Sequence, residues 1–467
     1  MTRATAAQSG ACIEALAARF GGRMTTALPV RQEHAGGEGG AESTPPDAVL
    51  FPRSIEDISA ALALCNDHRM PVIPFGAGTS LEGQLDAVRG GVSLDLSGMN
   101  RVLDIHGDDF DCRVEAGVTR EQLNHELRHS GLFFPIDPGA NATLGGMAAT
   151  AASGTNAVRY GTMREACLGV TAVLSDGRVF HTGSRARKSA CGYDLTRLLV
   201  GSEGTLAVIA ELQLRLAPIP EAIVAIVAQF PTLAAAVQAV VLLMQAGLRP
   251  ARIELLDELQ MSASIAYSRL ERLAATPTLF IEVHGPPAIV AEEKAQVTAV
   301  AVALGATVQT AERPEARNLL WKARHDAYWA ARALMPGGGS IVTDACVPLS
   351  KLEDSILAAR READAGGLTC PIVGHVGDGN FHMLILFDAD HERQRAAAAA
   401  LARRIGERAI ACGGTCTGEH GVGLHKRALL ARQHGTAIPV LAAIKHALDP
   451  FGILNPGKTL PEAARQP

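Results

Sequence analysis

The stretch DPGANATLGGMAATAASGTNAVRYG, residues 137–161, decides the fold class. From Pro138 to Val158 it runs for 21 residues without a charge, and most of them are Gly, Ala, Ser, Thr or Asn. The interrupting Gly, Asn and Thr residues exclude a membrane-spanning helix. A flexible linker is the alternative, but linkers rarely alternate small apolar and hydroxyl residues so densely. A backbone that closely approaches a bulky flat ligand needs small side chains and accessible N–H groups, and this tract supplies both.

A second glycine-rich loop, GAGTSLEG (residues 76–83), follows the expected strand MPVIPF. It is not a Walker loop, because no Lys-Ser/Thr pair follows. It is not a Rossmann fingerprint either, because its glycines stand at 76, 78 and 83 and strands are expected after it. Alone, this loop is equally well explained as a turn. Together with the charge-free tract it predicts a pocket for a pyrophosphate and an adjoining ring system.

Length and composition bound the class of protein. A chain of 467 residues with 48 % hydrophobic and 19 % charged residues is globular and long enough for two or three domains. The net charge of −5 and the lack of a Lys/Arg cluster argue against a nucleic-acid partner. No secretory signal or run of 18 apolar residues is found, so no transmembrane segment is expected. The nine scattered cysteines are expected to be free thiols in a reducing compartment.

The lengths of the expected helices and strands change near Pro218. Before it, short strands alternate with capped helices, such as the helix after Ser54. After it the units are longer, and their helices are expected to lie on one face of an antiparallel sheet. A single helix is expected over residues 313–334 and a single strand over residues 341–348.

The stretch VGHVGDGNFHML, residues 373–384, is predicted to be a β-hairpin with its two-residue turn at Asp378-Gly379. Such a turn makes His375 and His382 directly opposed partners on one face, with Cβ atoms roughly 5 Å apart. Two structural histidines and a metal site explain this pair equally well. TGEHGVG, residues 417–423, offers further candidates in Glu419 and His420. Adjacent residues in extended backbone point to opposite sides, so only one should face an ion unless the flanking glycines bend the chain.

Several motifs together resemble known flavoproteins. PFGAGTSLEG, the charge-free tract and VGSEGTL resemble the flavin domain of the vanillyl-alcohol-oxidase type. HVGDGNFH with TGEHGVG, and LDPFGILNPGK, are similar to the C-terminal half of flavin-linked D-lactate dehydrogenases of the cytochrome type and of the glycolate oxidase flavin subunit. The resemblance covers about residues 46–460, and its motifs stand in family order.

The resemblance implies an α+β fold. A vanillyl-alcohol-oxidase-type FAD-binding domain is expected with a ferredoxin-like substrate (cap) domain and a C-terminal segment returning to the flavin. The expected ranges are an N-terminal extension (1–45), the FAD-binding domain (46–218), the substrate- and metal-binding cap domain (219–425) and a C-terminal segment packing on the FAD domain (426–467).

The same resemblance implies which residues bind the cofactor. Relatives with covalent flavin use a His or Cys near these loops, and neither loop contains a histidine, so non-covalent FAD is expected. The residues expected at the FAD are Pro74, Gly76, Gly78, Thr79, Ser80, Pro138, Gly139, Thr143, Gly145, Ser153, Asn156, Tyr160, Glu203, Gly204 and Asn455.

For the chemistry, the resemblance implies that His375, His382 and Glu419 hold a divalent metal ion, Zn or Mn. His420 is the expected base, and Asn380 is expected to orient substrate or flavin. Four side chains, Arg317, Trp321, Arg324 and Tyr328, share one face of the expected helix. Arg324 is implied to bind the substrate carboxylate and Arg317 is interpreted as a surface arginine, whereas Trp321 and Tyr328 fit a pocket wall or the core equally well.

The resulting hypothesis is an FAD- and metal-dependent oxidation of D-lactate or related D-2-hydroxyacids to 2-oxoacids. Electrons would pass to cytochrome c or a quinone-linked carrier. One alternative is the flavin subunit of a multi-subunit glycolate oxidase, and another is a metal-dependent hydrolase whose glycine loops are structural. The expected location is the cytoplasm, and peripheral contact with the inner membrane stays open.

Overall fold

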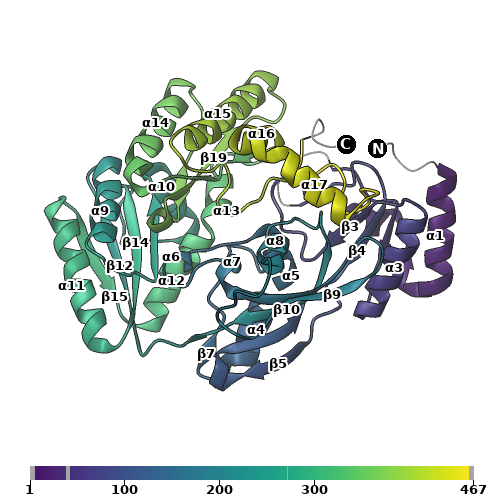
Figure 1. Cartoon of the computed structure of the whole chain (residues 1–467). Coiled ribbons are helices and arrows are strands. Elements are labelled where there is room, and N and C mark those ends of the chain that lie inside the picture. Colours follow the sequence, from purple (N-terminus) through teal and green to yellow (C-terminus); the bar gives the residue numbers. More distant parts are fainter. Residues whose placement is uncertain (1–5, 38–42, 271, 462–467) are drawn as a thin grey trace. The chain divides into compact units, whose positions relative to one another are not determined.

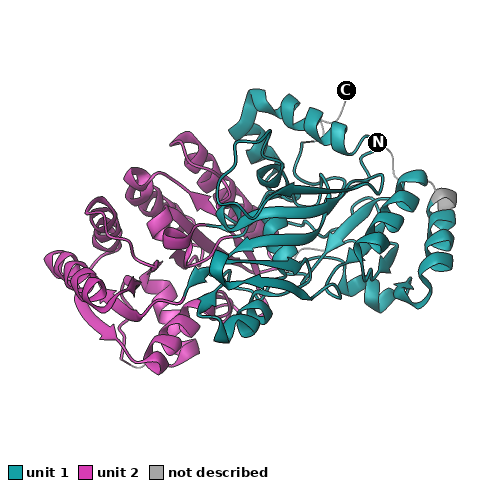
Figure 2. Cartoon of the chain, turned by 60° about the horizontal axis from the view of Figure 1, so that its bottom comes forward, with its two compact units in different colours: residues 1–152, 162–218, 419–467 teal, residues 153–161, 219–418 magenta. Residues whose placement is uncertain are grey.

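The computed structural model describes residues 6–37, 43–270 and 272–461 (Figure 1). The chain forms two compact units (Figure 2). Unit 1 comprises residues 1–152, 162–218 and 419–467, and unit 2 comprises residues 153–161 and 219–418. The charge-free tract is therefore divided: its part up to Ala152 belongs to unit 1, and Ser153–Gly161 belongs to unit 2.

The first sheet of unit 1 has the strand order β1-β2-β4-β3, in which β2, β4 and β3 are parallel. The helix α3 connects β2 to β3, and its N-cap Ser54 accepts a hydrogen bond from the backbone N–H of Asp57 at 3.2 Å, as expected. The bounds are α1 (Ala6–Phe20), β1 (Met24–Thr25), α2 (Leu28–Glu33), β2 (Ala48–Leu50), α3 (Ile55–Asp67), β3 (Val72–Phe75) and β4 (Val92–Asp95).

The second sheet of unit 1 is antiparallel, with the order β5-β6-β10-β8-β9. The expected hairpin of β8 and β9 is confirmed, with Val173 opposite Val179. The charge-free tract supplies the helix α5, whose Gly145 packs so closely that a Cβ there would lie 2.6 Å from the Cβ of Ala116. The bounds are β5 (Val102–His106), β6 (Asp111–Glu115), α4 (Arg120–Glu126), β7 (Leu132–Phe133), α5 (Leu144–Thr150), α7 (Met163–Ala166), β8 (Cys167–Val173), β9 (Val179–Gly183), α8 (Leu195–Leu199), β10 (Val208–Arg215) and β11 (Ala217–Pro218).

The C-terminal residues return to the first sheet of unit 1. After α16 (Arg427–His434) and α17 (Ile438–Leu448), the chain runs alongside β3. The backbone N–H of Val72 donates to the Ile453 carbonyl at 2.8 Å, and the N–H of Asn455 donates to the Val72 carbonyl at 2.8 Å. The tail thereby lies beside the strand that leads into the glycine-rich loop GAGTSLEG, residues 76–83.

Unit 2 is built on an antiparallel sheet with the order β15-β12-β14-β13-β18-β19-β16, and β17 also pairs with β19. The order of the first four strands, 4-1-3-2 in chain order, is the ferredoxin-like arrangement. The bounds are α6 (Ala157–Tyr160), β12 (Ala222–Gln229), α9 (Leu233–Gln245), β13 (Arg252–Leu256), α10 (Glu258–Ser268), β14 (Thr278–Gly285), α11 (Pro287–Ala303), β15 (Thr307–Ala311), α12 (Pro314–His325), α13 (Ala327–Arg332), β16 (Gly339–Val342), β17 (Ala345–Cys346), α14 (Leu352–Ala365), β18 (Ile372–Gly374), β19 (Asn380–Phe387) and α15 (Glu392–Ala411).

Helices cover both faces of this sheet, so the expectation of a single covered face is wrong. One face packs on α9, α11, α14 and α15 through a large apolar core that includes Leu255 and Ile281. The other face packs on α10, α12 and α13 through a smaller cluster around Phe280 and Trp321. Side chains alternate along a strand, so this second face also receives Glu254 and Glu282.

Two expected elements are interrupted. The helix over residues 313–334 breaks at Asp326, between α12 and α13. The carbonyl of Ala327, just past the break, accepts a hydrogen bond from the Gln260 side chain at 3.0 Å. The strand over residues 341–348 breaks at Thr343 and Asp344, whose side chains bond to residues of β19.

The histidine hairpin differs from its prediction in register. Val373 pairs with His382, and the backbone N–H of Asn380 donates to the His375 carbonyl at 3.3 Å, a shift of two residues. Of the expected turn pair only Gly379 has positive φ, +77°, and a 3₁₀ turn precedes it. Because a shift of two residues keeps each side chain on its side of a strand, the two imidazoles still share one face.

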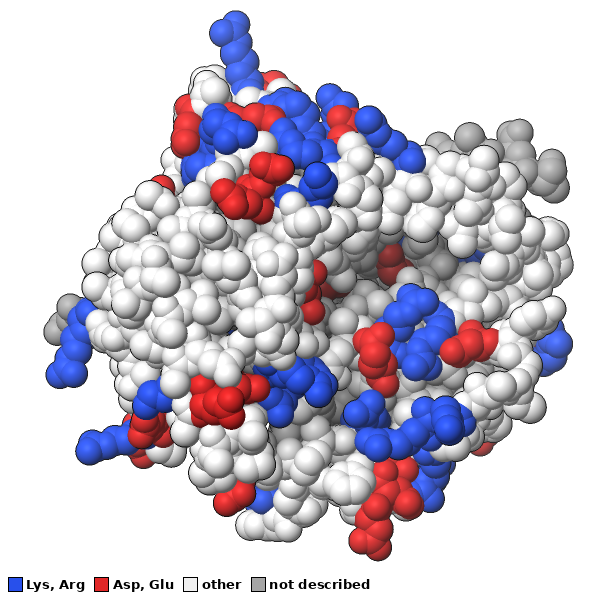
Figure 3. Space-filling view, turned by 60° about the vertical axis from the view of Figure 1, so that its left-hand side comes forward, with Lys and Arg blue, Asp and Glu red and all other residues white. Residues whose placement is uncertain are grey.

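No helix in the described ranges is long and apolar enough to cross a membrane. On the face drawn in Figure 3, basic and acidic side chains are interspersed.

Candidate active site

The two imidazoles of the hairpin are buried and fixed in orientation. Their ring centroids are 5.5 Å apart with the planes at 83°, and a ring nitrogen of one lies within 4.8 Å of a ring nitrogen of the other. His375 Nδ1 is 2.8 Å from Glu254 Oε1, and His382 Nδ1 is 3.0 Å from the Thr343 carbonyl. A carboxylate and a carbonyl only accept hydrogen bonds, so each Nδ1 carries a hydrogen, and the neutral form of each imidazole has its lone pair on Nε2. Metal-binding histidines are commonly held this way.

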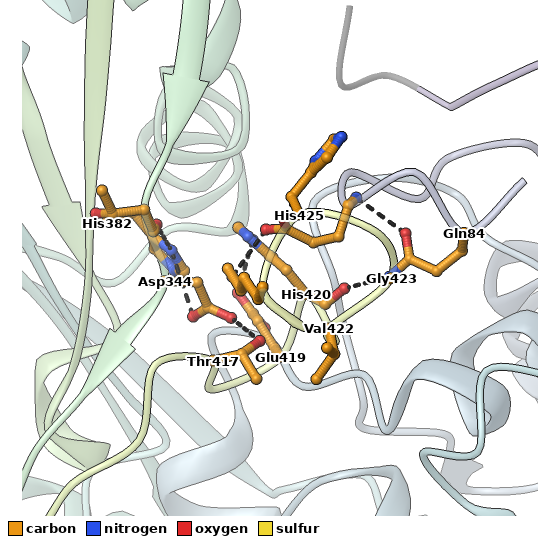
Figure 4. A network of polar contacts seen from close by, with 12 residues as sticks. Gln84, Asp344, His382, Thr417, Glu419, His420, Val422, Gly423 and His425 are labelled. Atoms are coloured by element: carbon orange, nitrogen blue, oxygen red, sulfur yellow. Dashed lines mark hydrogen bonds and ion pairs between the residues drawn. The ribbon is translucent and has the colours of Figure 1, made fainter. Parts of the chain in front are cut away.

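The segment that leads to Glu419 is held beside these histidines within unit 2. A Cβ on Gly418 would lie 2.5 Å from Asn380 Nδ2 and 3.1 Å from Asp344 Oδ1. The hydroxyl of Thr417 donates to Asp344 Oδ2 at 2.8 Å (Figure 4). Glu419 follows Gly418 directly, and one peptide link spans about 3.8 Å between Cα atoms. Two imidazoles, with a carboxylate as a third ligand, are a donor set that suits a divalent ion.

Asp344 is a buried residue that the sequence reasoning missed. Its Oδ1 accepts a hydrogen bond from Asn380 Nδ2 at 2.8 Å and lies 3.7 Å from His382 Nδ1. It therefore fixes the amide of Asn380, the residue expected to orient substrate or flavin. The available signal was an acidic residue inside the otherwise apolar stretch IVTDACV.

Arg324 lies on the same side of the sheet as the histidines and is held by Glu254. Its Nε and NH2 groups donate to Glu254 Oε2 at 2.8 and 2.7 Å, and both side chains are buried. Glu254 thus bonds to Arg324 with one oxygen and to His375 with the other. The edge of the guanidinium that carries NH1 is the one turned away from this contact, and it is the edge suited to a second carboxylate.

A second buried network lies on the next strand. Glu282 Oε1 accepts a hydrogen bond from His284 Nε2 at 2.7 Å and lies 3.5 Å from Arg252 NH1, while its Oε2 accepts from the indole N–H of Trp321 at 2.5 Å. Burial acts to raise the pKa of Glu282, but the bond from His284 and the charge of Arg252 outweigh it and hold that pKa below its usual value. Trp321 also packs in the core, as does the partly buried Tyr328.

Two residues expected at the flavin contact this network. Tyr160 Oη is 2.8 Å from His284 Nδ1, and Asn156 Oδ1 accepts from Arg252 Nε at 3.0 Å. Arg317 lies apart from it and donates to the carbonyl of Ile223 at 3.2 Å.

In unit 1 the structure brings together several residues expected at the nucleotide. A Cβ on Gly76 would lie 2.2 Å from Thr143 Oγ1, so the loop GAGTSLEG touches the charge-free tract. A Cβ on Gly204 would lie 2.9 Å from Pro74 Cγ. These close approaches leave no room for larger side chains. The amide of Asn455 donates to the Glu203 carbonyl at 2.8 Å, which ties the tail to the same place.

The other expected nucleotide residues fall into two groups. Thr79 and Ser80 follow Gly78, which has φ of +73°, in the loop after β3. Pro138 and Gly139 lie in the loop between β7 and α5, and Ser153 is the first residue of the part of the charge-free tract that belongs to unit 2.

Glu203 holds the loop that carries His420. Its carboxylate accepts hydrogen bonds from the backbone N–H groups of Val422 and Gly423, both at 2.7 Å. Burial raises the pKa of Glu203 to about 7, although these bonds act in the opposite direction. The amide of Gln84 donates to the His420 carbonyl at 2.8 Å (Figure 4). The backbone around His420 is therefore fixed on both sides.

The side chains of Glu419 and His420 converge. Glu419 Oε1 lies 4.0 Å from His420 Nε2, although adjacent residues in extended backbone would diverge. Gly421 has φ of +80°, which supplies the bend that the glycines permit.

Comparison with known proteins identifies the family. Residues 219–459 match the family of FAD linked oxidases, C-terminal domain, and residues 46–183 match an FAD binding domain. This chain belongs to the FAD-linked oxidases. It is α+β, as expected, and its family membership agrees with the motifs that suggested a flavoprotein.

Three relatives illustrate the similarity of the chain to known FAD-linked oxidases. It is 49 % identical to a probable mitochondrial D-lactate dehydrogenase of Danio rerio, over 92 % of this chain and 88 % of that protein. It is 46 % identical to the mitochondrial D-lactate dehydrogenase [cytochrome] of Arabidopsis thaliana, over 89 % and 74 %. It is 34 % identical to a glycolate oxidase subunit of Bacillus subtilis, over 90 % of each.

A solved structure shares the fold. The structure of p-cresol methylhydroxylase with substrate bound superimposes with a TM-score of 0.83 at 18 % identity, covering 97 % of both chains. At this identity the likeness concerns the fold alone.

Proposed function

We propose that this FAD-linked oxidase oxidises D-lactate, or a related D-2-hydroxyacid, to the 2-oxoacid. The observation that carries the proposal is the buried pair of His375 and His382, each with its Nδ1 tethered, on the sheet face that also bears Arg324. The similarity to D-lactate dehydrogenases over most of the chain supports the same substrate class.

Two groups would supply the chemistry that side chains lack. When bound, FAD would supply a hydride acceptor and a divalent ion, Zn or Mn, would supply Lewis-acid polarisation of substrate oxygens. His375, His382 and Glu419 are the proposed ligands of the ion. The proposed FAD-binding domain is residues 46–218 with the C-terminal segment 426–467, and residues 219–425 form the proposed substrate- and metal-binding cap.

The remaining chemistry falls to three side chains. Arg324 would hold the substrate carboxylate through the guanidinium edge that carries NH1, because Glu254 occupies the other edge. His420 would take the hydroxyl proton as the general base. Asn380, whose amide is fixed by Asp344, would orient the substrate or the flavin.

The direct test is anaerobic reduction of the bound flavin by D- and L-2-hydroxyacids without an added acceptor. D-lactate is expected to bleach the flavin absorbance rapidly, and L-lactate is not. If glycolate reduced the flavin fastest, or the chain were inactive without other subunits, the glycolate oxidase alternative would replace this proposal. A colourless purified protein would favour the hydrolase.

The FAD is expected to be bound non-covalently, because neither glycine-rich loop contains a His or Cys. Acid precipitation should release the yellow cofactor into the supernatant. Flavin that stays with the pellet would contradict this.

Replacing Arg324 with lysine is expected to raise KM for D-lactate about tenfold to a hundredfold. A lysine ammonium is a compact charge without a planar fork, so it cannot reproduce the two-nitrogen contact to Glu254 and at the same time offer a second edge to a substrate carboxylate. Loss of one charge-assisted contact costs about 1.5–3 kcal/mol. Steady-state kinetics checks this, with Arg317→Lys as the control, because Arg317 bonds elsewhere. An unchanged kcat/KM in the Arg324 variant would remove Arg324 from substrate binding.

The electron acceptor is proposed to be cytochrome c or a quinone-linked carrier, in keeping with the cytochrome type of the relatives. The location is proposed to be the cytoplasm, with peripheral contact at the inner membrane as the open alternative. Comparing acceptor reduction by purified protein with cytochrome c and with a soluble quinone tests the first point.

A further inference from the structure

Glu254 contacts both His375, a proposed metal ligand, and Arg324, the proposed substrate arginine. We propose that it is a positioning residue that sets the tautomer of His375 for metal binding and at the same time restricts Arg324 to one free edge. This inference rests on the proposed function, because it assigns work to a residue beside a proposed metal ligand and a proposed substrate arginine.

The positions of its partners fix the hydrogen bonds that Glu254 accepts. Its side chain is fully buried at the centre of β13, with Oε1 at 2.8 Å from His375 Nδ1 and Oε2 at 2.7–2.8 Å from two nitrogens of Arg324. The partners come from positions 70 and 121 residues away in sequence. A buried carboxylate is stable only when such donors satisfy it.

Both partners donate hydrogen bonds to Glu254, and this determines which ring nitrogen of His375 carries the hydrogen. A guanidinium can only donate. An imidazole can donate from one ring nitrogen and accept at the other, so the acceptor offered by Glu254 Oε1 places the hydrogen on Nδ1 of His375. The lone pair then lies on Nε2, where a metal ion can use it.

Glutamine at this position would reverse the tautomer. An amide offers one acceptor oxygen and one donor nitrogen in place of two acceptor oxygens. Arg324 cannot accept, so the amide oxygen must turn to it. The amide NH₂ then faces His375, which is satisfied by accepting at Nδ1 and carrying its hydrogen on Nε2. A nitrogen that carries a hydrogen does not ligate a metal.

The neighbouring strand supplies a matched control. Glu282 on β14 is buried on the same face, and it too contacts one histidine and one arginine, His284 and Arg252. Glu282→Gln therefore makes the same chemical change, in a similar environment, without touching His375 or Arg324. Any general effect of placing an amide in this face appears in both variants.

The experiment compares the wild-type chain with Glu254→Gln, Glu254→Asp, Glu282→Gln and His382→Ala. The dissociation constant for Zn²⁺ is measured by competition with a chromophoric chelator. Histidine ¹⁵N chemical shifts of the metal-free proteins report the tautomer, with the His375 signal assigned from a His375→Gln sample.

Glu254→Gln is expected to weaken Zn²⁺ binding about 10- to 100-fold and to move the hydrogen of His375 to Nε2. Glu282→Gln should leave both unchanged, and Glu254→Asp should keep the hydrogen on Nδ1.

Each result separates this inference from the proposed function. Wild-type chain that binds Zn²⁺ no better than His382→Ala would overturn the proposed metal site, whereas the nitrogen shifts would still report on Glu254. Wild-type affinity and an Nδ1–H tautomer in Glu254→Gln would overturn the role of Glu254 and leave the metal site standing. If Glu254→Gln failed to fold, an Nε2–H tautomer of His375 in the wild-type protein would overturn the inference by itself.

Discussion

Replacing His382 with alanine is expected to reduce D-lactate turnover by about two to four powers of ten while FAD stays bound. The imidazole is held on β19 in unit 2, whereas the glycine loops that are proposed to bind the nucleotide belong to unit 1. The loss of a metal ligand should therefore empty the ion site without releasing flavin. Several kcal/mol of stabilisation from a Lewis acid correspond to this factor, since each 1.36 kcal/mol is tenfold in rate.

The measurement is metal content by mass spectrometry beside flavin absorbance and steady-state rate. Chelation of the wild-type chain should reproduce the His382→Ala rate, and adding back Zn²⁺ or Mn²⁺ should restore only the wild type. His106→Ala is a suitable control, because His106 bonds to Asp111 in unit 1 and has no part in the site. Full activity of the wild-type chain without any divalent ion would end the metal hypothesis.

The register of the histidine hairpin shows that pairing between distant strands can override the turn preference of a local dipeptide. The Asp-Gly pair favours a two-residue turn, but the strand before it also pairs with β13, where Leu255 lies opposite Gly374. A Cβ on Gly374 would lie 2.7 Å from the Asn380 carbonyl, so the strands come together two residues before the predicted pairing. Non-local pairing thus outweighed the turn. The shared face was predictable, because it needs only the alternation of side chains.

The polar residues of unit 2 were visible in the sequence, but their partners were not. Arg252 and Glu254 alternate with apolar residues in ARIELLD, as Glu282 and His284 do in TLFIEVHG. That alternation indicates a polar face on each strand. Arg252 meets Glu282 through the register of β13 with β14, and Arg324 meets Glu254 through the packing of α12 on the sheet. Neither of these long-range contacts is encoded in a local pattern. The helix over residues 313–334 was expected, but its packing on a second face of the sheet was missed for the same reason.

The charge-free tract carried the fold prediction because small residues are required where backbones approach closely. Gly145 and Gly76 bear this out, each with a neighbouring side chain where a Cβ would stand. The sequence did not indicate that the tract changes unit after Ala152. Asn156 and Tyr160 consequently bond to β13 and to β14, a placement that composition alone gave no reason to expect.

Replacing His420 with alanine is expected to lower the rate of flavin reduction by about 10²–10⁴ while FAD and metal remain, the usual range for loss of a general base. The backbone of this loop is held independently of the imidazole, by Gln84 at the His420 carbonyl and by Glu203 at Val422 and Gly423. The substitution should therefore remove the imidazole without displacing the loop.

The convergence of Glu419 and His420 makes the contrast between two variants informative. With 4.0 Å between Glu419 Oε1 and His420 Nε2, either side chain is able to serve as a ligand or as the base. Glu419→Ala is expected to lose metal first and activity as a consequence, so adding excess Zn²⁺ should recover part of its rate. His420→Ala is expected to keep full metal occupancy, and added Zn²⁺ should change nothing. Metal content and anaerobic stopped-flow reduction of both variants measure this. Reduced metal occupancy in His420→Ala would make His420 a ligand, and a normal reduction rate with normal metal would remove it from the mechanism.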